Sequence, residues 1–505
     1  MRRRDLLAGG AAALAAGGLF GARQARAAWA DGPKSATGLL LGDGKRAQSV
    51  LEVFMYGGLS PWESFYVVED YGRPTDPQFP NTQWHLFADS HARVFRRNCG
   101  HEDPSAWLHD YAVDDNGMQV AMGPATMPLR NRSDIMERLR VVVLSHELEP
   151  HEAAIPYALS GHRLGNPRMA GMGAHVQRYF QERDTTARTT PFSYVLTNDT
   201  VFSTDNLLAS TSVGMHPGSA RPLSLTISGS DTLGQLLARD HLSDDERADV
   251  DALLAYYATE MEQRYQTLDG VALRARAATD HAFALDALAN APTLASVLGT
   301  ELLRPEGHAA CGESDSLDHT RVGIRAAAEL LRHPTDPARY VNVIDTGMKL
   351  ADGGGGYDTH FEHPETQAMN ATSLLQNLVD HINEPGENDP AKIDLDETMI
   401  VLTTEFGRTP YIQLAQGTNH FPYGYVAVLI GGPIGPDEAG LVGSLGPSGA
   451  ATHAVGPGEL RAALLAAMGM WPFSQESFAV GDLPEVSTEL DGLVWCIEHV
   501  LGVLP

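Results

Sequence analysis

The chain has 505 residues and is strongly acidic, with 64 Asp and Glu residues against 36 Lys and Arg residues and a formal net charge of −28. This balance excludes nucleic-acid binding through a broad basic face, and it gives no attraction to an anionic membrane surface. We interpret the charge as a solubility feature. The length is sufficient for a large buried core.

The first 27 residues have the features of a cleaved export signal. Arginines at positions 2–4 precede Asp5-Leu6-Leu7, an Ala/Gly/Leu stretch runs to Phe20, and Ala25-Arg26-Ala27 fits a cleavage site. The arginine pair is typical of the twin-arginine route. The apolar run is shorter than the ~20 residues of a membrane anchor. We therefore expect a periplasmic or otherwise exported protein without stable membrane insertion after cleavage. Loss of five Arg and one Asp would change the net charge from −28 to −32.

Five apolar, β-branched runs are predicted to be buried strands, and helix-period segments lie between them. The strands are expected at 50–56, 139–145, 340–345, 399–404 and 425–430, and helices at 244–265, 273–303, 318–332 and 364–382. Four of the runs are nearly continuous, which is typical of a sheet covered on both faces. The pattern predicts an α/β fold with a doubly wound, mainly parallel sheet.

The expected domain organisation is simple. After the signal at 1–27, residues 28–47 form a linker and residues 48–505 form one α/β domain with a mostly helical insertion at about 235–335. Residues 185–232 are expected to be loops or a small β excursion. Export permits a disulfide, and Cys99 and Cys311 are the expected pair because Cys496 lies in an apolar, helix-like segment.

Chemically useful side chains lie beside the strand ends. Ligands of open parallel sheets bind beyond the carboxyl ends of the strands. These side chains are Ser60 after the first strand, His151 after the second, Asp358 and His360 after the third, Glu405 and Arg408 after the fourth, and His420 just before the fifth. We therefore expect one shared polar site at this edge of the sheet.

Carboxylates and imidazoles are ligands for a zinc-like divalent ion. Asp358, His360, His420 and Glu405 are the candidate metal ligands, and Glu405 is alternatively a general base. A hydrogen-bonded network without an ion is the alternative interpretation of this set. Arg408 is interpreted as an anion-stabilising donor or as a structural partner of Glu405.

Ser60 follows Gly57-Gly58 and is a candidate nucleophile. The alternative role for Ser60 is an N-cap of the helix that follows.

Several of these motifs resemble the exported bacterial family called domain of unknown function 1501. The resemblance spans most of residues 48–470 and is carried by Gly57–Ser60, Tyr157–His162, Gly356–His360, Thr404–Thr409 and Asn419–His420, with a closing helix at 460–465. One departure is Asn419-His420-Phe421, where the family usually has Asp-His-Gly.

The order of motifs is also similar to that of the alkaline phosphatase and sulfatase superfamily. This resemblance places His151 at the nucleophile position, as nucleophile, proton shuttle or further ligand, and it implies one retained divalent-metal site. It implies a hydrolase of phosphate, sulfate or related esters, with a small anionic ester as substrate. The first-strand aspartates of sulfatases are replaced by Gly57-Gly58. For that reason a catalytically degenerate periplasmic binding or assembly protein is the alternative.

Overall fold

A computed structural model describes the following parts of the chain. They are residues 32–72, 84, 86, 93–96, 99–100, 102–103, 106–166, 170–183, 193–197, 223–226, 243–269, 318–334, 337–347, 356–411, 413, 416–474, 477–484 and 486–504. The expected signal at 1–27, the expected helix at 273–303 and Cys311 lie outside the described residues.

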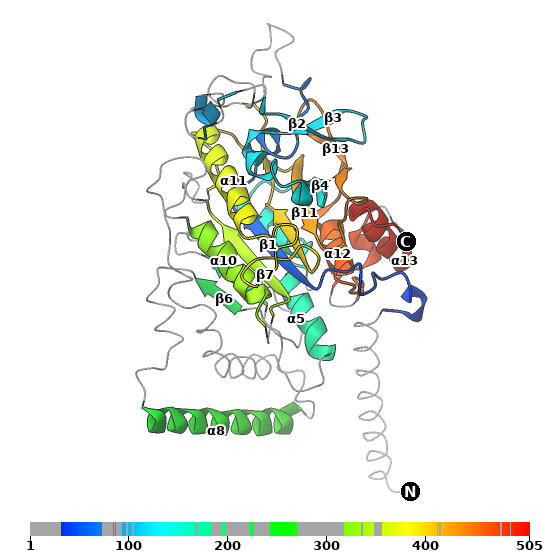
Figure 1. The fold of residues 1–505 in the computed structure, drawn as a ribbon. Helices are drawn as coiled ribbons and strands as arrows, with labels where there is room; N and C mark the ends of the chain where they lie inside the picture. Colours follow the sequence, from blue (N-terminus) through cyan, green and yellow to red (C-terminus); the bar gives the residue numbers. More distant parts are fainter. Residues whose placement is uncertain are drawn as a thin grey trace.

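The centre of the fold is an eight-stranded sheet with the order β12-β4-β11-β8-β1-β7-β5-β6 (Figure 1). Its strands are β1 (Ser49–Met55), β4 (Leu139–Leu144), β5 (Tyr194–Thr197), β6 (Leu223–Thr226), β7 (Tyr340–Asp345), β8 (Thr398–Thr403), β11 (Tyr425–Gly431) and β12 (Gly440–Val442). Only β11 runs against the others in this sheet, because it pairs antiparallel with both β4 and β8. The mainly parallel sheet and the five expected strands are confirmed.

Three strands of this sheet were not predicted individually. β5 and β6 fall inside the 185–232 segment, and they extend the main sheet in parallel beyond β7. β12 pairs in parallel with β4 at the opposite edge. All three have only three or four residues, too few for an apolar pattern to stand out from a loop.

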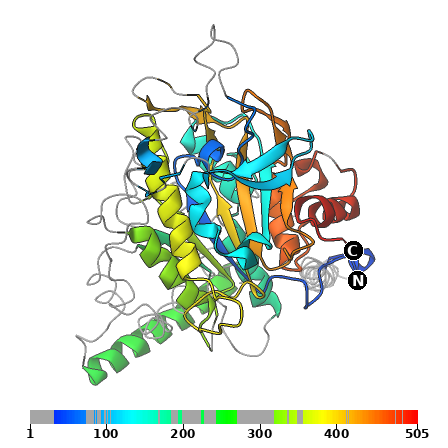
Figure 2. The same cartoon turned by 45° about the horizontal axis from the view of Figure 1, so that its top comes forward.

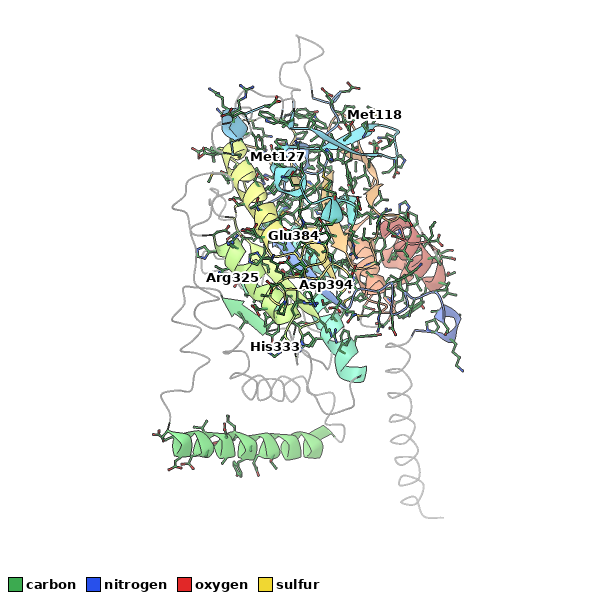
Figure 3. All side chains as sticks on the ribbon, in the orientation of Figure 1. Met118, Met127, Arg325, His333, Glu384 and Asp394 are labelled. Atoms are coloured by element: carbon green, nitrogen blue, oxygen red, sulfur yellow. The ribbon has the colours of Figure 1, made fainter. Side chains whose placement is uncertain are left out.

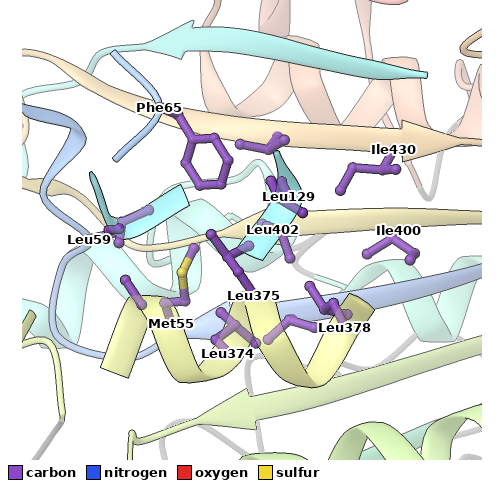
Figure 4. Close-up of a cluster of buried hydrophobic side chains, with 14 of the residues drawn as sticks. Met55, Leu59, Phe65, Leu129, Leu374, Leu375, Leu378, Ile400, Leu402 and Ile430 are labelled. Atoms are coloured by element: carbon purple, nitrogen blue, oxygen red, sulfur yellow. The ribbon is translucent and has the colours of Figure 1, made fainter. Parts of the chain in front are cut away.

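Alternate residues of β1 divide the core into two layers. Leu51, Val53 and Met55 belong to a hydrophobic cluster with α10 (His319–Leu331) and α11 (His363–Asp380). Figure 4 shows part of this cluster, with leucines of α11 beside Met55, Ile400 and Leu402. Val50 belongs to a second cluster with α5 (Met172–Arg183), α12 (Pro457–Ala467) and α13 (Glu489–Val494). The sheet is therefore covered on both faces, as Figure 2 shows from a second direction.

The remaining elements surround these layers. They are the helices α3 (Ser133–Met136), α4 (His151–Ser160) and α8 (Asp244–Asp269), the 3-10 helices η1 (Lys34–Ala36), η2 (Pro61–Glu63), η6 (Pro124–Leu129) and η9 (Val480–Asp482), the π-helix η10 (Trp495–Val500), and the paired strands β2 (His109–Val113) with β3 (Gln119–Met122), β9 (Gly407–Arg408) with β10 (His420–Phe421) and β13 (Ser444–Leu445) with β14 (Ala451–His453). Within the range expected as a helical insertion, α8 confirms a helix, and α10 packs on β7 of the central sheet.

A buried ion pair ties the sheet to the α12 layer. The guanidinium of Arg461 in α12 donates to both carboxylate oxygens of Glu52 in β1, at 2.8 and 2.6 Å. Tyr340 and Thr403 also donate to this carboxylate. Glu52 and Arg461 are both fully buried. Both oxygens of the Glu52 carboxylate therefore have hydrogen-bond donors, as a charge buried in a core requires.

Side chains fill the body of the domain densely (Figure 3). Cys99 is disulfide-bonded, whereas Cys496 is a buried free thiol. None of the described helices is both long and apolar enough to cross a membrane.

Candidate metal centre

The expected polar site forms at one edge of the central sheet. Residues following β1, β4, β7 and β8 meet there because these strands run in one direction. The reversed direction of β11 brings its first residues to the same edge, together with the preceding His420. Five separate segments of the chain thus contribute to one centre.

Asp358 is the hub of the centre. Its Oδ1 atom lies 3.1 Å from Nε2 of His360 and 3.2 Å from Nε2 of His420, while Oδ2 lies 3.4 Å from Nε2 of His151. Arg408 donates to Oδ1 at 3.0 Å. Burial works to raise the pKa of Asp358, but hydrogen bonds from the three histidines and the charge of Arg408 hold that pKa far below its usual range.

Glu405 orients His151 from behind. Nδ1 of His151 lies 2.9 Å from Oε1 of Glu405, and Nε2 points to Asp358. Burial lowers the pKa of His151, but its two carboxylate neighbours prevail and raise the pKa to about 9. A proton on Nδ1 shared with Glu405 leaves Nε2 directed at the centre. This is the carboxylate–histidine arrangement that supports metal ligands from outside the coordination sphere.

His420 is oriented in the same way by a backbone carbonyl. Its Nδ1 lies 2.7 Å from the carbonyl oxygen of Glu149. A carbonyl only accepts hydrogen bonds, so Nδ1 is a donor here and Nε2 is the ring nitrogen directed at the centre. The ring stacks on Phe406, with centroids 4.3 Å apart, and this contact holds the imidazole plane.

The donor atoms fit a zinc-like ion. One ligand atom each from His151, Asp358 and His420 lies within 4.8 Å of the others, and two imidazole nitrogens with one carboxylate form a familiar zinc donor set. His360 is beside them, with its Nε2 3.2 Å from Nε2 of His420 and its side chain 34% exposed. Of the expected ligands, Asp358, His360 and His420 therefore meet, and His151 joins them.

Glu405 and Arg408 occupy other places than expected. Glu405 is fully buried, and its Oε1 accepts from His151 and from the Gly57 N–H at 2.8 Å, so it supports a ligand from behind. Arg408 pairs with Asp358 and not with Glu405. Its guanidinium is fully buried, and it also donates to the Gly57 carbonyl and to Thr418. Arg408 therefore holds Asp358 in place, and its side chain has no exposed surface.

The Gly57-Gly58 turn lies directly against Asp358 and Arg408 of the centre. Both residues have positive φ, +113° and +104°. A Cβ on Gly57 would lie 2.1 Å from the backbone nitrogen of Asp358, and one on Gly58 would lie 2.8 Å from Cδ of Arg408. Only glycine permits this close approach of the first-strand turn to the loop that carries Asp358.

Ser60 is fully buried at the N-cap position of η2, but its side chain makes no capping hydrogen bond. Its backbone N–H donates to Gln367 at 3.3 Å. Within the described residues, its hydroxyl makes no hydrogen bond.

Several supporting residues escaped the sequence analysis. Gln367 in α11 donates to the carbonyls of Gly58 and Tyr357, both at 2.9 Å, and so joins two loops of the centre. His146 lies 2.7 Å from the Glu405 carbonyl through Nε2. The only available signal for His146 was its place directly after a predicted strand.

A second layer of polar residues supports Arg408. The Oγ1 atom of Thr418 accepts from Nε of Arg408 at 3.0 Å and lies 3.1 Å from Nδ1 of His363. His363 is buried and pairs with Glu63 at 2.9 Å. The local sequence does not indicate the pair of His363 with Glu63, because these two residues lie on distant segments.

The comparisons with known proteins agree with the motifs at this edge of the sheet. The sequence profile of the family described as "Protein of unknown function (DUF1501)" matches residues 47–491. No curated protein and no solved structure matches the chain. Because the matched range includes every residue of the centre and most of the chain, this protein belongs to the DUF1501 family.

Proposed function

We propose that the protein is a hydrolase dependent on one divalent ion, acting on a small ester of phosphate, sulfate or a related anion. The observation that carries this proposal is the orientation of His151 and His420. Each has Nδ1 engaged with an acceptor outside the centre and Nε2 directed at Asp358. Two imidazole nitrogens and a carboxylate oxygen thus converge on one point, and a divalent ion bound there would replace the protons that Nε2 shares with Asp358.

His151, Asp358 and His420 would hold the ion. When bound, a divalent ion supplies a Lewis acid that polarises a phosphoryl or sulfuryl oxygen and favours ionisation of water. Arg408 fixes the Asp358 carboxylate, the Gly57 turn lies against the Asp358 backbone, and Glu405 fixes the tautomer of His151, so the ligands need little rearrangement. His360 is one-third exposed and touches the centre, and it is placed to carry a proton between the reacting group and solvent.

Metal analysis of the purified protein tests the proposal. We expect close to one zinc-like ion per chain, and we expect Asp358→Asn or His420→Asn to remove it. Asp110→Asn and His109→Asn are matched controls, because both residues lie on the exposed surface of β2. A panel of phosphate, phosphodiester and sulfate esters then tests turnover with and without a chelator. Absence of a bound ion from the wild-type protein would contradict the proposal.

A second candidate is a binding or assembly protein that retains the fold without the chemistry. The Gly57-Gly58 turn favours it, since the turn offers no acidic ligand and the space for a side chain is occupied by the backbone of Asp358. In that case the ion would bind, but no ester of the panel would be hydrolysed. Variants of Asp358 and His420 would then leave the biological function intact.

We also propose export through the twin-arginine route and a distant relationship to the alkaline phosphatase and sulfatase superfamily. The first rests on residues 1–27, and the second on the order of the motifs around the centre. Neither nucleic acid nor membrane is proposed as a partner. Twin-arginine substrates fold before they cross the membrane, which suits a centre built from five distant segments.

A further inference from the structure

The fixed charges around the centre are few and can be counted. Asp358 and Glu405 each carry one negative charge, and Arg408 carries one positive charge, with all three side chains buried. Histidines that bind a metal do so as neutral imidazoles. A divalent ion would therefore leave the centre with a single positive charge. Buried charges are screened weakly, so this sum acts strongly on a ligand that enters.

The arginines on these segments are already engaged with other groups. The four hydrogen bonds of Arg408 go to Asp358, Gly57 and Thr418. Arg163, on the loop after α4, is paired with Glu147. A ligand with two negative charges would consequently bring one uncompensated charge into the centre, which is costly in a partly buried site.

The rim of the centre adds negative charge. Glu149, whose carbonyl holds His420, has an exposed side chain that accepts from the Tyr423 hydroxyl at 3.0 Å. Glu152 follows His151 directly and is exposed at the start of α4. Both carboxylates oppose the approach of a dianion more strongly than that of a monoanion.

From this charge balance we infer that the centre selects esters whose reacting group carries one negative charge. Sulfate monoesters and phosphate diesters belong to this class, whereas phosphate monoesters are dianions above neutral pH. The inference rests on the proposed function and narrows its substrate class. It assigns the selection to Glu405, because its buried charge enters the balance although Glu405 is not among the three grouped ligands.

Binding of two simple anions tests the inference without relying on turnover. Dimethyl phosphate carries one charge and methyl phosphate carries two at pH 8, and both present the same phosphoryl group. Titration calorimetry on the zinc-loaded full-length protein should give dimethyl phosphate at least about tenfold tighter binding. Turnover of p-nitrophenyl sulfate and bis(p-nitrophenyl) phosphate should likewise exceed that of p-nitrophenyl phosphate.

Glu405→Gln removes the negative charge of this side chain while most of its hydrogen bonds can still form. The amide oxygen can still accept from His151 and from the Gly57 N–H. The amide nitrogen can donate to Thr404, whose hydroxyl lies 3.1 Å from Oε2 of Glu405 and itself donates to the Met55 carbonyl. We expect this variant to shift the ratio of the two affinities toward methyl phosphate by about tenfold.

Glu152→Gln is the matched control, because it removes an exposed charge that solvent screens. It should change the ratio by less than about threefold. Equal or tighter binding of methyl phosphate to the wild-type protein would overturn the inference while leaving the proposed ion site intact. If neither anion binds the zinc-loaded protein, both the inference and the proposed hydrolase activity are wrong. If the protein does not bind zinc, the proposed function is wrong at its first step. The wild-type comparison decides the inference even if Glu405→Gln does not fold.

Discussion

Gly57 offers the most direct test of how the centre is built. In Gly57→Ala, the new Cβ would lie 2.1 Å from the Asp358 nitrogen, and an ordinary contact begins at 3.4 Å. The backbone of Asp358 must therefore move by about 1.3 Å, whereas close-packed interiors and metal sites tolerate only a few tenths of an ångström. The positive φ of residue 57 adds strain of about 1–3 kcal/mol.

Gly38→Ala is the control for the strain alone. Gly38 also has a positive φ, +91°, but nothing lies within 4 Å of its Cβ position. In urea unfolding with chelator present, Gly38→Ala should lose about 1–3 kcal/mol, and Gly57→Ala should lose more. Competition with a chromogenic chelator should show zinc affinity about 10- to 100-fold weaker in Gly57→Ala and unchanged in Gly38→Ala. If Gly57→Ala matches Gly38→Ala in stability and the wild type in zinc affinity, the role assigned to the turn is wrong.

Other parts of the molecule give further predictions. Arg461→Met should lower the free energy of unfolding by about 3–5 kcal/mol, because Glu52 would stay buried without its counter-charge; a loss below about 1 kcal/mol in urea unfolding would contradict this. Burial raises the pKa of Asp345 to about 6, above its unfolded value of 3.8. Stability should therefore fall by about 3 kcal/mol as the pH rises from about 4 to about 6. Asp345→Asn should remove this part of the pH profile, and an unchanged profile would refute the assignment. Changing Arg3 and Arg4 to Lys should keep the chain in the cytoplasm, while the wild-type chain should be recovered outside it and begin after residue 27. Equal export of both would exclude the twin-arginine route.

Much of the fold was predictable because buried strands leave a strong apolar signal. All five expected strands are present, and their ends bring Asp358, His360 and His420 together as expected. The direction of β11 was not predictable from its composition, because an apolar strand buried on both faces has the same pattern in either direction. Because of that direction, His420, which precedes β11, reaches the centre, and the residues after β11 do not.

The assignment of roles within the site was less predictable. His151 is a ligand candidate, and Glu405 lies behind it, although both have the side chains of metal ligands. Which of two such groups reaches the centre depends on how deeply each side chain is buried. Only the packed structure determines that burial. The same holds for Gln367, whose two carbonyl acceptors lie on segments far from α11 in the sequence.

The central place of β1 has a consequence for how the chain folds. β1 is bordered by β7 and β8, so its two partners are synthesised roughly 290 and 350 residues after it. Because a chain is synthesised from its N-terminus, the apolar β1 segment must wait unpaired while most of the protein is made. Such long-range pairing makes folding slow and leaves an aggregation-prone edge exposed meanwhile. The protein is therefore expected to depend on chaperones during synthesis, and its ligand set is completed only when β11 has joined the sheet.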